Sequence, residues 1–329
     1  MAISSTTVPS AGPQAASRSF LSRLRDGDEI ARIITFVFAG SVVLITVMLV
    51  IQLWQGSVLA RHKFGLAFFF TSTWDPNADQ FGAWPFIYGT LVTSAVSMLI
   101  AVPLGIGAAI FLAELAPQKI SDSLQFFIDL LAAVPSVIYG LLGVFIVVPL
   151  MRQYVEPALK SSLGFTPLFT GPPFGVGFLT AGIVLAIMVI PYIISVSREV
   201  LLSVPRDQRE AALALGSTRW ESTWQVVVPF ARTGIMGSIF LALARALGET
   251  MAVTMVIGNA PTVSASLLSP GYSIAAVIAD QFSEATGQLY VQALVELGLV
   301  LFLLTFILNG LARLLIVVTT QRGSGTANA

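Results

Sequence analysis

Six long apolar stretches alternate with polar segments along this chain. A membrane helix needs about 20 apolar residues, because each residue rises about 1.5 Å and the hydrocarbon layer is about 30 Å thick. A seventh apolar stretch, 272–286, is too short to span and carries Asp280 and Glu284, which predicts a short helix in a loop or at the interface. We therefore expect an all-α polytopic membrane protein with six transmembrane helices, placed near 32–53, 86–112, 126–150, 178–200, 231–258 and 291–318.

Composition supports the membrane assignment and excludes several kinds of site. Of 329 residues, 56% are hydrophobic and only 10% are charged, whereas about 25% are charged in soluble domains. The net charge is zero, so no nucleic acid is expected as a partner. The chain has no cysteine and one histidine, His62, which excludes disulfides, thiolate metal sites and catalytic triads built on histidine. We predict no catalytic site and no metal site.

The distribution of basic residues predicts the topology. We divide the chain into a polar and disordered tail with a basic flank (1–30), a membrane domain (31–320) and a short tail (321–329). The basic flank forms either an interfacial helix or a solvated segment that only fixes topology. Twelve basic residues fall on the side of the N-terminus and four on the other, which predicts that both termini are cytoplasmic. The twelve are Arg18, Arg23, Arg25, Arg32, Lys119, Arg198, Arg206, Arg209, Arg219, Arg232, Arg313 and Arg322; the four are Arg61, Lys63, Arg152 and Lys160.

Other polar residues and prolines near the spans give weaker signals. We expect the carboxylates of Glu114, Asp129 and Glu296 to lie at solvated helix ends, and His62 to be a solvated loop residue. Proline interrupts three of the predicted helices, which favours a cavity or moving parts over a simple anchor. These prolines are Pro103, Pro135 and Pro191.

The fifth predicted helix carries an arginine inside the membrane. Arg245 lies in the sequence Arg-Ala-Leu-Gly-Glu-Thr, and a central arginine costs at least about 2.5–3.5 kcal/mol on insertion scales. Glu249 follows four residues later, so the two side chains can pair on one helix face. The pair is either a structural ion pair or part of an anion pathway, in which the arginine offers a planar fork of donors to oxyanions.

The longest inside loop, about 201–230, contains a second motif. Glu210-Ala211-Ala212 is followed by Gly216 and then by Val226-Val227-Val228-Pro229. Leu215 lies on the same helical face as the two alanines, and small residues permit close approach of a partner. Spacing alone is also compatible with a simple amphipathic connector.

This motif resembles the EAA loop of ABC-importer permeases, E-A-A-x3-G-x9-I-x-L-P, with valines at the Ile and Leu positions. The resemblance implies the type I importer permease fold and a coupling helix that sits in a cleft of an ATPase subunit. The residues that it assigns to coupling are Glu210, Ala211, Ala212, Leu215, Gly216 and Pro229.

Three further stretches resemble phosphate-importer permeases of the PstC type. They are the sequence from Ala244 to Val253, the segment Trp74–Leu91 with its Phe-Gly-Ala-Trp-Pro run, and Val134–Gly140. The resemblance covers about residues 30–320. It implies a phosphate pathway, for which the candidate residues are Arg245, Glu249, Thr250, Tyr139 and Ser136.

The resemblance also implies partners and a location. They are a PstA-like second permease subunit, a PstB-like ATPase dimer and a PstS-like phosphate-binding protein, assembled in the lipid bilayer of the bacterial cytoplasmic (inner) membrane. The chain has no G-x-x-x-x-G-K-[ST] phosphate loop, so we expect no bound cofactor and ATP use by the partner ATPase. Three alternatives stay open: a sulfate or molybdate permease, an ion-coupled secondary carrier, and a sensor platform in phosphate signalling.

Overall fold

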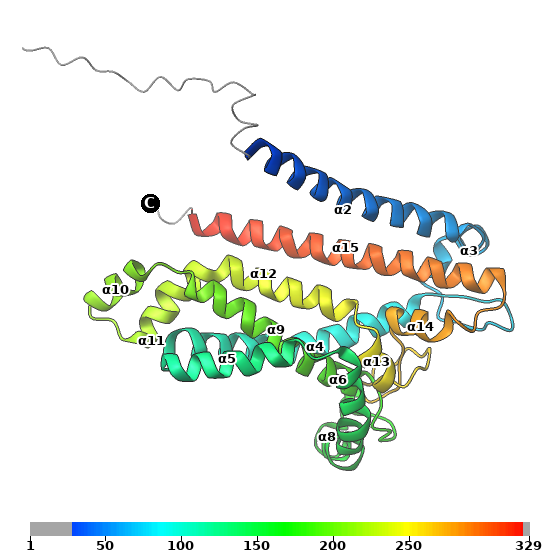
Figure 1. The fold of residues 1–329 in the computed structure, drawn as a ribbon. Coiled ribbons are helices and arrows are strands. Elements are labelled where there is room, and N and C mark those ends of the chain that lie inside the picture. The colour runs from blue at the N-terminus through cyan, green and yellow to red at the C-terminus, as the bar shows by residue number, and fades with distance from the viewer. Residues whose placement is uncertain (1–27, 325–329) are drawn as a thin grey trace, which may run out of the picture. The chain divides into compact units, whose positions relative to one another are not determined.

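A computed structural model describes residues 28–324 of the chain, which divide into one unit up to Gln52 and a second from Leu53 onward. Within these residues the regular structure is helical, apart from one isolated antiparallel bridge between Asp75 and Gln80 (Figure 1). The elements are α2 (Asp28–Gly56), α3 (Val58–Phe64), η1 (Gly65–Phe69), α4 (Trp84–Ile110), η2 (Phe111–Leu115), α5 (Gln118–Ala132), α6 (Ser136–Leu142), η3 (Gly143–Val147), α7 (Val148–Leu150), η4 (Met151–Val155), α8 (Glu156–Leu163), η5 (Pro167–Phe169), α9 (Phe178–Leu202), α10 (Arg206–Ala214), α11 (Arg219–Ser222), η6 (Thr223–Val227), α12 (Val228–Leu247), α13 (Met251–Val256), α14 (Ile274–Gln281) and α15 (Gln288–Ser324).

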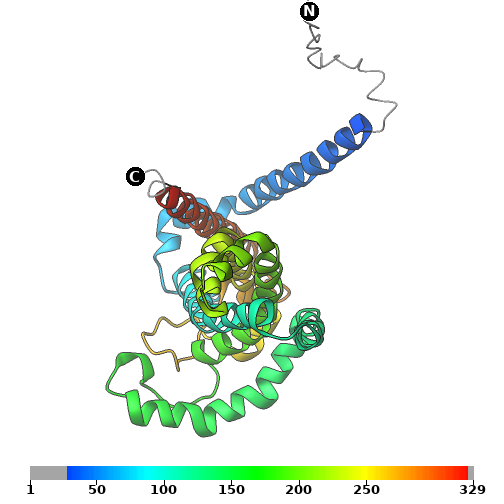
Figure 2. The same ribbon diagram turned by 90° about the vertical axis from the view of Figure 1, so that its left-hand side faces the viewer.

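The number of membrane helices and the fold class are confirmed. Among the described residues, six helices are long and apolar enough to cross a membrane, namely Ile30–Gly56, Trp84–Leu115, Ser136–Leu163, Phe178–Leu202, Arg219–Leu247 and Gln288–Leu314. The third begins ten residues later than expected and continues through a segment expected to be a loop. Figure 2 shows this span leaving the helical bundle. Most of the polar tail assigned to 1–30 lies outside the described residues.

Helix α9 is the centre of the bundle, because α4, α5 and α12 all pack against it. Small residues bring the helices together. A Cβ atom added to Gly105 of α4 would lie 2.7 Å from Cγ2 of Ile193, and one added to Gly182 of α9 would lie 2.4 Å from Cγ1 of Val96. Without a strong hydrophobic force between helices in lipid, such close backbone contact supplies the packing energy. These glycines therefore fix the spacing of α4 and α9.

Only one of the three prolines coincides with a helix break. Pro103 lies inside α4 and Pro191 lies inside α9, and both helices continue past them. Helix α5 does end before Pro135, and α6 begins at Ser136. Membrane helices tolerate proline where neighbouring groups satisfy the freed carbonyl. The expectation of a break was therefore wrong at Pro103 and Pro191.

At the opposite end of the bundle from α10, an aromatic cluster ties the segment before α4 to α14. The indole of Trp74 donates a hydrogen bond to Gln281 Oε1 at 2.9 Å, and Tyr290 donates to the same oxygen at 2.8 Å. Tyr272 donates to Asp280, and burial together with this carboxylate raises the pKa of Tyr272 above its ordinary value. The tyrosine therefore stays a proton donor at neutral pH. The short helix expected within 272–286 is confirmed as α14.

Glu296 does not lie at a solvated helix end, contrary to expectation. It sits in the third turn of α15, is only 2% exposed, and its Oε2 atom has no hydrogen-bond partner among the described residues. Ala293 and Leu297, its neighbours on α15, belong to an apolar cluster. His62 is exposed, as predicted.

Candidate functional site

The fifth membrane helix is broken next to its arginine. Helix α12 ends at Leu247, with Gly248 as its C-cap, and α13 begins at Met251, with Thr250 as its N-cap. Glu249 lies in the break, and its Oε1 accepts a hydrogen bond from the Ala252 amide at 3.2 Å. A carboxylate there satisfies one of the free amides that begin α13.

The break rules out the pairing that we expected between Arg245 and Glu249. An i,i+4 contact requires a continuous helix, and α12 stops between these residues. No ion pair joins them, although both lie in the described part of the chain. Arg245 is instead exposed, with its guanidinium carbon 5.9 Å from the centre of the Tyr192 ring on α9. The arginine is therefore an uncompensated cation held against an aromatic face.

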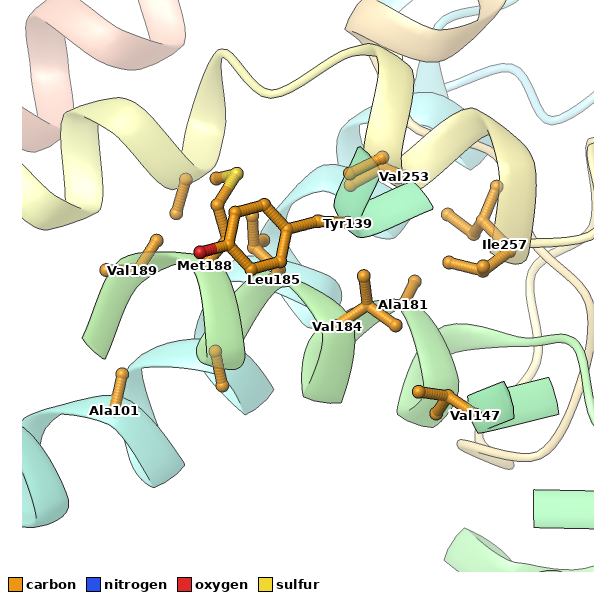
Figure 3. Packing of buried hydrophobic residues seen from close by; sticks show 14 of the residues in the cluster. Ala101, Tyr139, Val147, Ala181, Val184, Leu185, Met188, Val189, Val253 and Ile257 are labelled. Atoms are coloured by element: carbon orange, nitrogen blue, oxygen red, sulfur yellow. The ribbon is translucent and has the colours of Figure 1, made fainter. Parts of the chain in front are cut away.

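A second break separates α5 from α6. Ser136 is the first residue of α6 and is half-buried. Tyr139, one turn later, is 6% exposed and donates its hydroxyl proton to the carbonyl of Leu131 in α5, at 2.7 Å. In Figure 3 the Tyr139 ring lies over α9, close to Leu185 and Met188. The tyrosine thus holds the two half-helices together across the break.

The two breaks lie side by side. A Cβ atom added to Gly140 of α6 would lie 3.2 Å from Cα of Ala252 in α13. One added to Gly143 would lie 2.7 Å from Cγ1 of Val256. These two contacts advance in the same direction along both segments, so α6 and α13 run parallel. Ser136, four residues before Gly140, is therefore level with the break between Leu247 and Met251. Many transporters form their substrate site near the membrane midplane from discontinuous helices whose breaks are adjacent, as they are here.

A polar cluster that we did not predict lies beside the breaks. Asp129 is one turn before the end of α5, and its Oδ1 accepts hydrogen bonds from Ser195 Oγ (2.6 Å) and Gln125 Nε2 (2.7 Å). We expected Asp129 at the solvated start of a helix; it is exposed, but it lies near the end of α5, which begins at Gln118. Ser195 follows Tyr192 by one turn of α9, which places the cluster next to Arg245.

The coupling motif forms an exposed groove at the far end of α12. Helix α10 ends at Ala214, and Gly216 adopts a φ of 88°, a left-handed conformation that favours glycine. The groove has a volume of about 560 Å³, and Ala211, Ala212, Leu215 and Gly216 all line it. Leu215 is 90% exposed, an unusual state for a leucine unless a partner covers it.

The other two coupling candidates lie outside this groove. Glu210 lines a separate, smaller pocket together with Arg206 and Arg209. Pro229 is exposed and lies just after η6, inside the continuous helix Arg219–Leu247.

A buried ion pair fastens α10 to the membrane helices. Arg209 contacts both carboxylate oxygens of Glu114, with the shortest distance 2.8 Å from Nη2 to Oε1. The same guanidinium donates to the carbonyls of Leu201 and Val204 at the end of α9. The side chains are only 19% and 10% exposed, so the expectation of a solvated Glu114 was wrong. The pair makes α10 move with α4 and α9.

Comparison with known proteins gives the family. A family model described as the binding-protein-dependent transport system inner membrane component matches residues 101–316. The phosphate transport system permease protein PstC of Mesorhizobium japonicum is 46% identical over 287 residues, which cover 86% of each chain. The chain belongs to this permease family, in its PstC branch. It is therefore a multi-pass inner membrane protein.

Further relatives and solved structures agree with this assignment. The permease is 49% identical to PstC of Xylella fastidiosa (80% of this chain and 82% of the relative) and 37% identical to the probable PstC of Methanocaldococcus jannaschii (87% and 92%). It shares its fold with the inward-facing MetNI methionine ABC transporter (TM-score 0.52, 15% identity, 74% of this chain and 98% of that chain). A bacterial alginate ABC importer gives the same TM-score at 16% identity (88% and 98%).

The permease thus brings the sequence candidates together in two places. Arg245, Thr250 and Ser136 gather at the paired helix breaks, while the EAA residues gather around α10. The sequence did contain a signal for the break at Gly248, because Gly followed by Thr is the usual order of a helix stop and a new helix start. The partners of Asp129 and Glu114 had no such signal, since they are 66 and 95 residues away.

Proposed function

We propose that the chain is the permease subunit of an ATP-driven inorganic phosphate importer and forms half of its translocation pathway. The observation that carries this proposal is the position of Arg245, an exposed cation at two adjacent helix breaks. A guanidinium offers paired donors to oxyanions, and several curated relatives are named phosphate transport permeases.

The physical chemistry of phosphate favours an alternating, water-filled pathway. Phosphate carries one to two negative charges, and removing its water costs far more than a single arginine can return. The ion therefore stays largely hydrated while the cavity opens to one side and then the other. Arg245 lowers the barrier at the midpoint of that route, and the hydroxyl groups of Ser136 and Thr250 at the breaks line it. Glu249 caps the start of α13 beside the pathway and, within the described residues, does not pair with Arg245.

The exposed coupling groove supports a separate ATPase as the energy source. Ala211, Ala212 and Leu215 form a small apolar surface that fits a cleft in a PstB-like ATPase dimer, which would bind and hydrolyse ATP. A PstA-like permease would supply the other half of the pathway, and a PstS-like protein would deliver phosphate. This arrangement places α10 and both termini in the cytoplasm, in agreement with the twelve basic residues on that side.

Uptake of labelled phosphate by cells that lack this gene tests the proposal. At low external phosphate, the intact gene is expected to restore uptake, and excess unlabelled sulfate or molybdate is expected to leave the restored rate unchanged. The strain should lack other phosphate importers, so that no second route hides the loss. Uptake that does not depend on the gene, or that sulfate abolishes, would overturn the phosphate assignment.

A further inference from the structure

In the cluster of Asp129, Gln125 and Ser195, every side-chain hydrogen-bond donor is engaged, whereas some acceptor atoms have no partner. The Ser195 hydroxyl donates to Asp129, and the Gln125 amide donates to Asp129 and, at 2.9 Å, to Ser195. No described residue donates to Asp129 Oδ2, and Gln125 Oε1 is buried without a hydrogen-bond partner. A ligand that meets this cluster must therefore bring its own proton donor.

The position of the cluster makes this requirement relevant to the pathway. Helices α5 and α12 both pack against α9, and each presents a charged side chain to it. Ser195 and Tyr192 are one turn apart on α9, with Asp129 bound to the first and Arg245 near the ring of the second. Asp129 and Arg245 are both exposed and each lies within one turn of its helix break. An anion attracted by Arg245 therefore meets the field of Asp129 as well.

A carboxylate beside an anion pathway discriminates between oxyanions. At neutral pH inorganic phosphate keeps at least one O–H group, which can donate a charge-assisted hydrogen bond to a carboxylate. Sulfate is fully deprotonated at this pH and presents only acceptor oxygens, so the same carboxylate repels it. Contacts that favour one ligand and oppose its competitor are how binding sites obtain specificity.

We propose that Asp129 is a specificity-determining residue of the permease and selects oxyanions that carry a proton. Its Oδ2 atom accepts the O–H of phosphate, while Arg245 faces the unprotonated oxygens. Ser195 and Gln125 are positioning residues, because their hydrogen bonds hold the Asp129 carboxylate in place. This inference rests on the proposed phosphate pathway and adds a second selective step to any made by a delivering protein.

Because the chain has no cysteine, a single introduced cysteine can be labelled selectively, which allows a direct test. Ala133 is exposed in the break that follows Asp129, so an Ala133→Cys variant reports on occupancy through its rate of reaction with a maleimide. The purified complex, without ATP or binding protein, is labelled in phosphate, arsenate or sulfate at matched ionic strength. At an anion concentration about four times the apparent dissociation constant, phosphate and arsenate should slow labelling about fivefold. Sulfate should leave the rate unchanged.

Substitution of Asp129 then separates selectivity from simple binding. In the Asp129→Asn background the new amide donates a hydrogen bond, so sulfate is expected to slow labelling as much as phosphate does. Asp122→Asn, an exposed carboxylate on the same helix, should preserve the preference for phosphate. Ser136→Cys provides a second reporter, and the comparison of anions with Asp129 intact stands even if Asp129→Asn does not assemble.

Several results would overturn the inference. Equal protection by phosphate and sulfate with Asp129 intact would remove its selective role, as would a preference that survives Asp129→Asn. If no anion slows the labelling, no anion binds at this cluster. Labelled phosphate uptake by the same Ala133→Cys complex is measured in parallel. If uptake is normal but labelling shows no preference for phosphate, only the role of Asp129 is contradicted. If the complex without any substitution does not take up phosphate, the transport function itself is contradicted.

Discussion

Replacing Arg245 with glutamine is expected to reduce phosphate uptake by roughly 100-fold, as for the loss of a charged donor aimed at a developing charge. Glutamine keeps hydrogen-bonding capacity but lacks the positive charge that lowers the barrier for an anion at the helix breaks. Because Arg245 is exposed and forms no ion pair in the described structure, its loss leaves no buried carboxylate without a partner. The amount of assembled complex and its ATPase docking should therefore be unchanged while initial uptake rates fall.

Two variants control this measurement. Arg245→Lys retains the charge without the planar fork of donors, so uptake should fall less than with glutamine. Arg232→Gln removes an exposed arginine near the start of the same helix and should leave uptake at the level of the unaltered protein. Normal transport by a well-assembled Arg245→Gln complex would show that the arginine has only a structural role.

Replacing Arg209 with alanine is expected to disconnect the coupling helix from the membrane helices. The substitution leaves Glu114, which is 10% exposed, without its partner, and breaking a buried pair in this way costs about 3 kcal/mol. It also frees the carbonyls of Leu201 and Val204 at the end of α9. We expect a lower thermal unfolding temperature and, in complexes that assemble, ATP hydrolysis that no longer drives uptake.

The neighbouring Arg206 supplies the matched control for this prediction. It is exposed on the same helix and forms no ion pair in the described part of the chain, so Arg206→Ala should change neither stability nor the ratio of uptake to ATP hydrolysis. In a double-mutant cycle, Glu114→Ala should cost little once Arg209 is absent, because the two side chains act as a unit. Additive effects of the two substitutions would contradict a coupling role for the pair.

The sequence predicted the membrane helices well because hydrophobic length is a local property. About 20 apolar residues indicate a span wherever they occur, and the number of six spans is confirmed, although the third begins ten residues later than expected. Helix continuity was harder to predict. Helices α4 and α9 continue past their prolines, whereas the fifth membrane helix is interrupted between Gly248 and Thr250, where there is no proline. Whether a helix continues depends on what satisfies its free amides, and here the Glu249 side chain does so.

Charged residues were predicted less well because their partners are distant in sequence. Glu114 meets Arg209 and Asp129 meets Ser195 only after α4, α5, α9 and α10 have packed. Glu296 is buried for the same reason, since α15 is covered by elements far from it in the chain. Spacing within one helix also misled us at Glu249, where the helix that would have supported the i,i+4 contact does not continue.

The central claim is that phosphate crosses this subunit at the paired helix breaks, and blocking that point tests it most directly. A Ser136→Cys complex, whose other subunits have no accessible cysteine, is reconstituted in proteoliposomes, and ATP-driven accumulation of labelled phosphate is measured before and after reaction with a bulky maleimide. Our account predicts transport before the reaction and its loss afterwards. Modification of Ser123→Cys, exposed on α5 three turns away, should leave transport intact. Undiminished accumulation after complete modification of Ser136→Cys would contradict the proposed pathway.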